Sequence, residues 1–213
     1  MKTKIDHLVV AAASLDEGVT YVQNILGVDI PYGGEHPLMG THNHVMPIGQ
    51  NIFLEVIAQN PEAEKPLHPC WFGFDDPLIQ KSLLSQPRLL TWVVNTSDIN
   101  ACLGGAKMSC GRAHKLRRGA LEWYFGLPAD GRLLVSGMLP YIIQWQTEKH
   151  PASLMADSHC VLKKLDIFYP KVQWLQGVFT SIGFTFDNNI CLHQGEARLE
   201  ATLQTPSGRK VLL

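Results

Sequence analysis

Apolar and polar positions alternate along the chain in a way that predicts short strands and helices. Residues 5–11, IDHLVVA, are apolar and β-branched, which predicts a strand with His7 on one of its faces. Ser14 begins an S-x-x-E capping box, so a helix should follow, and Gly27 is a suitable end for it. Two apolar runs within residues 41–58 flank a turn and predict a hairpin. The first third of the chain is therefore predicted to run strand, helix and three strands.

The middle of the chain repeats this order. Residues 88–95 predict a strand, and a short helix after them ends at the glycines 104–105. Residues 120–128 and 139–145 supply the paired strands that follow. The spacing from His7 to Glu55 nearly equals the spacing from Trp92 to Gln144. The two halves are thus predicted to be copies of one supersecondary unit.

A third, partial copy follows, with a strand at 160–170, a helix that ends at Gly183 and alternating residues at 197–204. We therefore predict an α+β fold in which tandem β-α-β-β-β units form a cup-shaped mixed sheet. A partial third β-α-β-β unit lies at the C-terminus. The expected division is a domain over residues 1–150, with units at about 1–66 and 86–150, and a C-terminal extension over 151–213.

Composition narrows the class of protein. The chain has 213 residues, 46% of them hydrophobic and 17% charged, as expected of a globular fold with a substantial core. A net charge of -1 argues against nucleic acid or an anionic membrane as a partner. The basic cluster at 112–118 is interpreted first as a solvated loop and second as an anion contact.

The expected compartment is the cytoplasm. Five scattered cysteines without a C-x-x-C pair suit reduced thiols and do not suggest a disulfide framework. Asp6 and His7 interrupt the apolar opening of the chain, which argues against a signal peptide, and no stretch approaches a membrane span.

Several sequence blocks resemble the glyoxalase-like branch of the vicinal-oxygen-chelate superfamily, which includes glyoxalase I and extradiol dioxygenases. In order along roughly the first 150 residues they are IDHLVVAAASLDEG, GGEHPLMGTHN, FLEVIA, WFGFDDP, RLLTWVVNTSDINA and LPYIIQWQTEKHPA. The resemblance implies a cup whose metal ligands come from the first and last strands of each unit. His7 and Glu55 match these positions in the first unit. In the second unit the positions fall on Trp92 and Gln144, a departure from the pattern because tryptophan cannot bind a metal.

The residues themselves also single out His7 and Glu55, on inward positions of predicted strands. A carboxylate on an apolar strand face is costly unless it is paired, coordinated or protonated. Two interpretations stay open: both side chains bind a divalent metal, or they form a hydrogen-bonded pair without metal. A metal needs a third donor, and His42 and His44 are the available imidazoles; we take His44 as the candidate ligand.

Three residues of the glycine-rich stretch, His36, His42 and Asn43, are candidates for binding substrate oxygens; the alternative is a turn whose side chains cap backbone donors. Most of the large aromatic residues are expected in the core. Trp71 is kept as a candidate contact to the substrate.

The repeat aligns Trp92 with His7, so Trp92 is expected to form a wall of the cup beside Gln144, whose amide would orient the substrate. Both residues are therefore candidates for substrate binding.

Two functions are compatible with these residues and with the resemblance. The first is a metal-dependent lyase, isomerase or dioxygenase that acts on a carbonyl or vicinal-oxygen compound, with Zn, Fe, Mn or Ni as the metal. Glu55 and His7 are then the candidate catalytic residues, and without metal Glu55 abstracts a proton while His7 orients it. The second is a non-catalytic protein that binds or sequesters a small molecule. Neither uses a nucleotide cofactor, since no P-loop or dinucleotide fingerprint is present. Homodimerisation is a further expectation, because cup-forming units often pair between chains.

Overall fold

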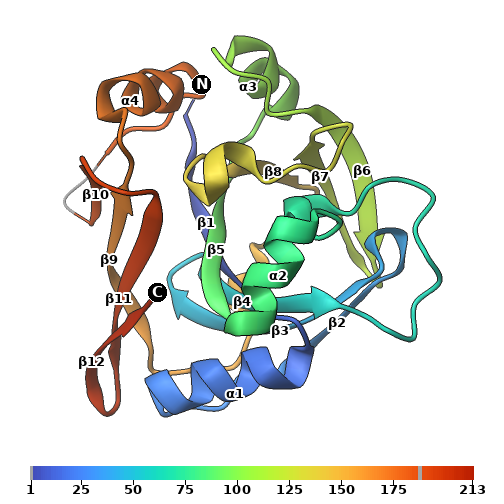
Figure 1. Ribbon diagram of the computed structural model, residues 1–213, viewed down its shortest axis with the longest axis vertical. Helices are drawn as coiled ribbons and strands as arrows, with labels where there is room; N and C mark the ends of the chain where they lie inside the picture. The colour runs from blue at the N-terminus through green and yellow to red at the C-terminus, as the bar shows by residue number, and fades with distance from the viewer. Residues whose placement is uncertain (1, 187–188) are drawn as a thin grey trace.

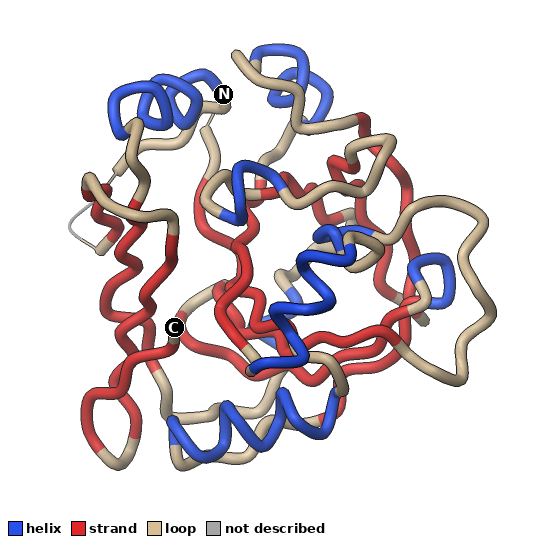
Figure 2. The backbone as a smooth tube through the Cα atoms, viewed as in Figure 1, coloured by secondary structure: helices blue, strands red, loops and turns tan. Residues whose placement is uncertain are grey.

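The computed structural model describes residues 2–186 and 189–213, and its strands form two sheets (Figure 1). The larger sheet has eight strands in the order β2-β3-β4-β1-β5-β8-β7-β6, and the smaller has four in the order β10-β9-β11-β12. In the backbone trace of Figure 2 the eight-stranded sheet curls into a half-barrel, while the smaller sheet stands beside it. The predicted α+β class with a cup-shaped mixed sheet is confirmed.

The first unit of the large sheet has the predicted order. Ser14 Oγ accepts a hydrogen bond from the Glu17 backbone N–H and so caps the helix, which ends at Gly27 with a left-handed φ of 70°. The last strand of the unit pairs in parallel with the first. Its elements are β1 (Lys4–Ala11), α1 (Leu15–Leu26), β2 (Tyr32–His36), β3 (Thr41–Gly49) and β4 (Ile52–Gln59).

The second unit repeats this topology, because its first and last strands are again parallel neighbours. Antiparallel pairing of β1 with β5 joins the two units into one continuous sheet. Its elements are β5 (Arg88–Asn95), α3 (Ile99–Gly105), β6 (Arg112–Arg118), β7 (Leu121–Leu127) and β8 (Tyr141–Trp145).

Connecting segments surround the half-barrel. The helix α2, Pro77–Ser85, crosses in front of the sheet in the view of Figure 1. Four short 3-10 turns accompany it: η1 (Pro37–Met39), η2 (Trp71–Gly73), η3 (Leu134–Gly137) and η4 (Pro151–Leu154). Among the described residues, no helix combines the length and the hydrophobicity needed to cross a bilayer.

The C-terminal part of the chain has the same order of elements but a different pairing. Its strand β10 pairs in parallel with β9, and β11 pairs antiparallel with both β9 and β12. The first and last strands are therefore not neighbours, as they are in the first two units. The short strand β10 was not among the predicted strands. The elements are β9 (Val161–Phe168), α4 (Val172–Ser181), β10 (Ile190–His193), β11 (Arg198–Thr205) and β12 (Gly208–Leu212).

Candidate active site

A cavity lies on the concave side of the eight-stranded sheet, and we call it the cup. Its free volume is about 40 Å³, enough for a few waters or one small polar group. The polar residues that line it are His7, His36, Asn43, Glu55 and Arg118, and the aromatic ones are Phe53, Trp71, Phe72, Trp123, Phe125 and Trp145. The structure therefore brings together five residues that the sequence singled out: His7, His36, Asn43, Glu55 and Trp71.

An irregularity in β1 turns two consecutive polar residues of this strand, Asp6 and His7, toward each other. In the pairing with β5, Ile5 lies opposite Val94 and His7 opposite Val93, so Asp6 is an extra residue in β1. Such a bulge re-aims side chains, whereas consecutive residues of a regular strand point to opposite faces. As a result His7 Nδ1 lies only 2.6 Å from Asp6 Oδ1.

Asp6 is a fully buried carboxylate that accepts four hydrogen bonds. His7 Nδ1 donates to Oδ1, while Asn95 Nδ2 at 3.1 Å, Trp145 Nε1 at 2.8 Å and His150 Nε2 at 2.9 Å donate to Oδ2. Burial raises the pKa of Asp6, but the hydrogen bonds from His150 and His7 outweigh it and hold this pKa far below its usual value. Asp6 is therefore ionised and acts only as an acceptor.

The ionised Asp6 fixes the tautomers of both histidines. His150 accepts the Ala152 backbone N–H on Nδ1, so its Nε2 carries the proton that goes to Asp6. His7 must carry a proton on Nδ1, which leaves Nε2 as its free ring atom. The ring is held flat against Phe53, with centroids 4.4 Å apart. An aspartate that orients a histidine in this way is a common arrangement for acid–base catalysis.

Glu55 reaches the same place from β4. Its Oε1 accepts a 2.5 Å hydrogen bond from Asn43 Nδ2, and its Oε2 lies 3.7 Å from His7 Nε2. That separation exceeds a hydrogen bond. His7 and Glu55 therefore do not form a direct hydrogen bond. His7 bonds Asp6 and Glu55 bonds Asn43, which leaves His7 Nε2 and Glu55 Oε2 facing each other.

Arg118 extends this network from β6. Its Nη1 donates to Asn43 Oδ1 at 2.9 Å and to His36 Nε2 at 3.3 Å. Burial and the nearby Arg118 lower the pKa of His36 to about 3, so His36 is neutral and accepts from the guanidinium. Gly33 makes room for the Asn43 amide, because a Cβ at this position would lie 2.4 Å from Asn43 Oδ1. The bonds from Arg118 through Asn43 fix the position of Glu55.

Trp71 lies in the wall of the cup with a polar atom unsatisfied. Its indole Nε1 is buried and has no hydrogen-bond partner, although the ring packs edge-on against His36 with centroids 5.0 Å apart. Buried donors nearly always find an acceptor in a protein, a water or a ligand. An oxygen atom of a bound molecule would satisfy this donor.

Two residues expected in the cup lie on the other face of the sheet. Trp92 packs against Phe179 and Phe184 and donates from Nε1 to the Met138 carbonyl at 3.1 Å. The bulge at Asp6 explains the difference, because it places Val93 and not Trp92 opposite His7.

The expectation for Gln144 differs from the structure in the same way. Its Oε1 accepts the Ile99 backbone N–H at 2.9 Å, so the side chain caps the start of α3. On β8 the residues that line the cup are its neighbours Ile143 and Trp145. A shift of one residue along a strand exchanges the two faces.

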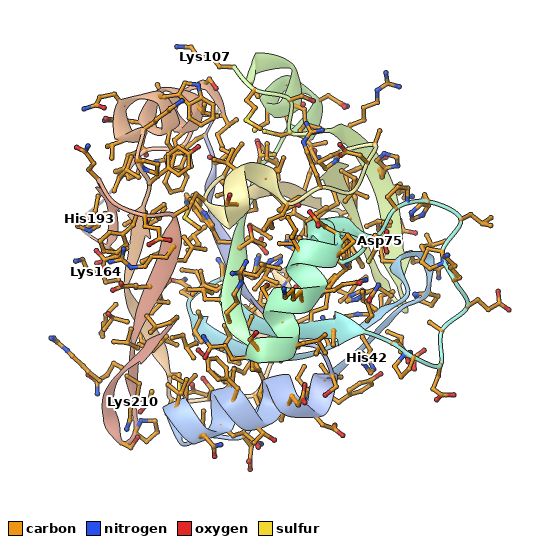
Figure 3. All side chains as sticks on the ribbon, viewed as in Figure 1. His42, Asp75, Lys107, Lys164, His193 and Lys210 are labelled. Atoms are coloured by element: carbon orange, nitrogen blue, oxygen red, sulfur yellow. The ribbon has the colours of Figure 1, made fainter. Side chains whose placement is uncertain are left out.

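His42 and His44 also point away from the cup. The residues of this strand that line the cup are Asn43 and Val45. His44 Nδ1 bonds the Ile30 carbonyl, and His42 lies near Ser14 and Asp16 at the start of α1, as its label in Figure 3 shows. The two histidines do share a face, as predicted, but it is the face opposite to that of Asn43.

The donor set of the cup does not fit a divalent metal held by protein ligands. Only His7 Nε2 and Glu55 Oε2 converge, while the Asp6 oxygens are occupied and the expected third ligand, His44, faces away. Catalytic zinc sites use three protein ligands. Within residues 2–186 and 189–213, three such donors come together only in the C-terminal sheet.

Comparison with known proteins agrees with this architecture. A family model described as a glyoxalase-like domain matches residues 5–181. The chain therefore belongs to the glyoxalase-like domain family, within the vicinal-oxygen-chelate superfamily that its sequence blocks resemble. No curated protein sequence matches the chain.

Several solved structures match the chain at low sequence identity. A hypothetical protein from Staphylococcus aureus has a TM-score of 0.59 and 13% identity, and the match covers 92% of this chain and 87% of that one. A methylmalonyl-CoA epimerase variant from Streptomyces coelicolor, bound to 2-nitronate-propionyl-CoA, has a TM-score of 0.44 and 18% identity, with 71% and 100% covered. A hypothetical protein from Bacillus halodurans has a TM-score of 0.43 and 13% identity, with 70% and 97% covered. The first match extends the shared fold into the C-terminal sheet.

Sequence reasoning missed Asp6 and Arg118 as site residues. Aspartate is depleted in strands, so its place beside His7 in an apolar run was a usable signal. Arg118 belongs to the basic cluster for which an anion contact was the second interpretation. Trp123 and Trp145 were assigned to the core, and no pattern in the sequence distinguishes a core tryptophan from one that lines a cavity.

Proposed function

We propose that the protein catalyses proton transfer at a carbon beside a carbonyl group, a reaction of the isomerase or lyase class, with Glu55 and His7 as the acid–base pair. The observation that carries the proposal is the pair of facing atoms, Glu55 Oε2 and His7 Nε2, 3.7 Å apart in the cup. Both residues are almost completely buried and are held by Asn43 and Asp6. Fixed geometry of this kind favours general acid–base catalysis.

The reaction begins at the carbon–hydrogen bond next to the substrate carbonyl. Glu55 takes the proton from the carbon, and the electron pair of the broken bond moves to the carbonyl oxygen to give an enolate. When that carbon also carries a hydroxyl group, His7 Nε2 takes the hydroxyl proton and passes it to the enolate oxygen. Glu55 returns its own proton to the former carbonyl carbon, the hydroxyl oxygen becomes the new carbonyl, and the isomerisation is complete. Asp6 keeps His7 in one tautomer throughout.

Two donors of the cup suit the enolate oxygen. Arg118 supplies a positive charge, and the unpaired Trp71 Nε1 supplies a neutral N–H. Donors fixed in advance in a water-poor cavity stabilise the charge that develops during such a reaction. The aromatic walls exclude water and accept the apolar part of the substrate.

The donor set supports a proton transfer that needs no resident metal. A dioxygenase or a chelating isomerase would require a further ligand from the substrate or solvent beside His7 and Glu55. Elemental analysis of the purified protein, with activity measured before and after treatment with a chelator, tests this point. Activity that depends on a stoichiometric metal would overturn the metal-free form of the proposal.

Exchange of hydrogen for deuterium tests the proposed step without knowledge of the product. The protein is incubated in D₂O with hydroxyacetone and with 2-oxobutyrate, and loss of the proton signal next to the carbonyl is followed by NMR. We expect enzyme-dependent exchange with at least one compound. Glu55→Gln should slow it by about 100- to 10,000-fold, the usual contribution of a general base.

The matched control is His42→Gln, which changes a histidine of the same sheet that faces away from the cup. It should leave the exchange rate unchanged, whereas His7→Gln should lower the rate strongly. Exchange that survives in Glu55→Gln would rule out Glu55 as the base.

The apolar wall of the cup favours a second candidate function, binding of a small hydrophobic molecule without chemistry. In that case the protein shows no exchange, but a hydrophobic ligand raises its melting temperature. Substitution of Trp123 by alanine would then weaken binding, while Glu55→Gln would not.

The small-molecule partner and the cytoplasmic location are parts of the same proposal. The five free cysteines, four of them buried, support a reducing compartment. Homodimerisation and the division of the chain near residue 150 stay predictions, and light scattering of the full chain and limited proteolysis would test them.

A further inference from the structure

A second group of reactive side chains lies on the outer face of the C-terminal sheet, away from the cup. Asp166 on β9 and Cys191 and His193 on β10 each offer one ligand atom, and the three atoms lie within 4.8 Å of one another. We call these three residues the outer triad. Figure 3 labels His193 and its neighbour Lys164 at the edge of the molecule formed by β9 and β10.

The strand pairing brings the outer triad together. Cys191 lies directly opposite Asp166 in the parallel pair of β10 and β9, and His193 follows two positions later on the same face. Neighbouring strands are about 4.8 Å apart, so three side chains at these positions can converge on one ion. The sheet therefore provides a rigid base for the three donors.

The histidine of the triad is already oriented. Its ring stacks on Phe168, with centroids 4.7 Å apart at an angle of 24°, and the Arg198 guanidinium lies 3.5 Å from the centre of the Phe168 ring. His193 Nε2 points at Asp166 Oδ1 at 2.5 Å. Little side-chain freedom would be lost when this nitrogen binds an ion, which is the advantage of preorganisation.

Lys164 occupies the place that a cation would take. Its Nζ lies 2.7 Å from the same Asp166 oxygen. The Lys164 side chain is 42% exposed, and the lysine can swing into solvent when an ion arrives.

We propose that the outer triad binds a zinc-like divalent cation through Cys191 Sγ, His193 Nε2 and an Asp166 oxygen, with water as the fourth ligand. Thiolate, imidazole and carboxylate together suit a borderline-soft ion such as Zn²⁺ better than Mg²⁺ or Ca²⁺, which prefer oxygen ligands alone. The ion would tie the short edge strand β10 to β9. This site is independent of the cup and of the function proposed for it.

Titration of the full-length protein with Co²⁺ and Zn²⁺ tests the proposal. We expect one equivalent of Co²⁺ to bind with a sulfur-to-metal charge-transfer band, Zn²⁺ to displace it, and protons to be released on binding because the thiol must ionise. Cys191→Ser should abolish the band. His193→Gln should weaken binding by at least about 10- to 100-fold, the loss typical when a residue that only hydrogen-bonds to a metal ligand is replaced.

Replacement of Lys164, which competes with the ion for Asp166, provides a second test. Lys164→Met should tighten Zn²⁺ binding by about two- to fivefold, because an exposed ion pair to Asp166 is lost from the metal-free state. His159→Gln is the control, since His159 pairs with Asp157 on the surface and belongs to no group of three metal donors among the described residues. Sub-stoichiometric binding, or a band retained in Cys191→Ser, would overturn the proposal.

Discussion

The two units of the half-barrel have the same topology but contribute different groups to the cup. The first unit supplies the groups that can move or hold a proton: Asp6, His7, Asn43 and Glu55. The second unit supplies the aromatic walls from β7 and β8 and one cation, Arg118. At the positions where the superfamily pattern would repeat the metal ligands, the second unit has Trp92 and Gln144, and both side chains bond backbone groups outside the cup.

This difference shows how a repeated unit can specialise while its backbone is kept. Residues that pair within the core of each unit preserve the fold. The side chains on the concave face differ between the units, with acid–base groups in the first and mainly aromatic groups in the second. Two hydrogen-bond networks connect the first unit to the second, one centred on Asp6 and one on Asn43. Substitutions in these networks can therefore separate stability from chemistry.

The largest expected effect is on Asp6, which ties β1 of the first unit to β5 and β8 of the second. Asp6→Ala leaves four buried N–H groups without their acceptor, and we expect the free energy of unfolding to fall by about 3–5 kcal/mol. Urea denaturation followed by fluorescence measures it.

The contrasting carboxylate is Asp166, whose partners lie at the surface. Asp166→Ala should lower the free energy of unfolding by only about 1 kcal/mol or less. Equal effects of the two substitutions would contradict the assignment of Asp6 as the link between the units.

Removal of the cation should affect chemistry more than stability. Arg118→Met takes away the charge proposed to stabilise the enolate, so we expect the deuterium exchange rate to fall about 100-fold. The melting temperature should fall as well, though less than in Asp6→Ala, because the buried Asn43 Oδ1 and His36 Nε2 lose one donor. Arg117→Met is the control on the same strand. Arg117 is exposed, its Nε donates to the Gly119 carbonyl, and its side chain does not line the cup. An exchange rate that falls equally in both variants would point to a general effect of charge.

His36 should make the protein sensitive to acid. Its pKa is about 3 in the folded protein and about 6.5 in the unfolded chain, so the unfolded state binds more protons as the pH falls through 6.5. We expect the protein to lose about 2 kcal/mol of stability from this residue between pH 7 and pH 5. Asp6 adds to acid destabilisation only below its ordinary pKa near 4. Melting temperatures against pH should be flatter in His36→Gln, whereas His42→Gln should keep more of the slope.

A small effect is expected for the Trp145 indole, which donates to Asp6 from the second unit. Trp145→Phe keeps most of the wall but removes the 2.8 Å hydrogen bond, so the free energy of unfolding should fall by about 1 kcal/mol. Trp174→Phe, at a residue on α4 that is 45% exposed, is the control and should change it by less than about 0.5 kcal/mol. Thermal denaturation of both variants provides the comparison.

The sequence alone determined the order of elements within the two units of the half-barrel and the face on which two residues lie. Apolar, β-branched runs in residues 5–11 and 52–58 and the capping box at Ser14 predicted strands and a helix that the structure contains, because these patterns depend only on the local sequence. The same periodicity placed His7 and Glu55 on inward faces, and the cup does contain them.

The tertiary structure decided everything that depends on register. One extra residue at Asp6 shifts β1 against β5, so Trp92 packs against Phe179 and Phe184 instead of lining the cup, and Asp6 reaches His7. Arg118 meets Asn43 only because the sheet curls until its two edges approach. Such contacts join residues far apart in the chain, and a one-residue slip changes them without altering the local pattern of hydrophobicity.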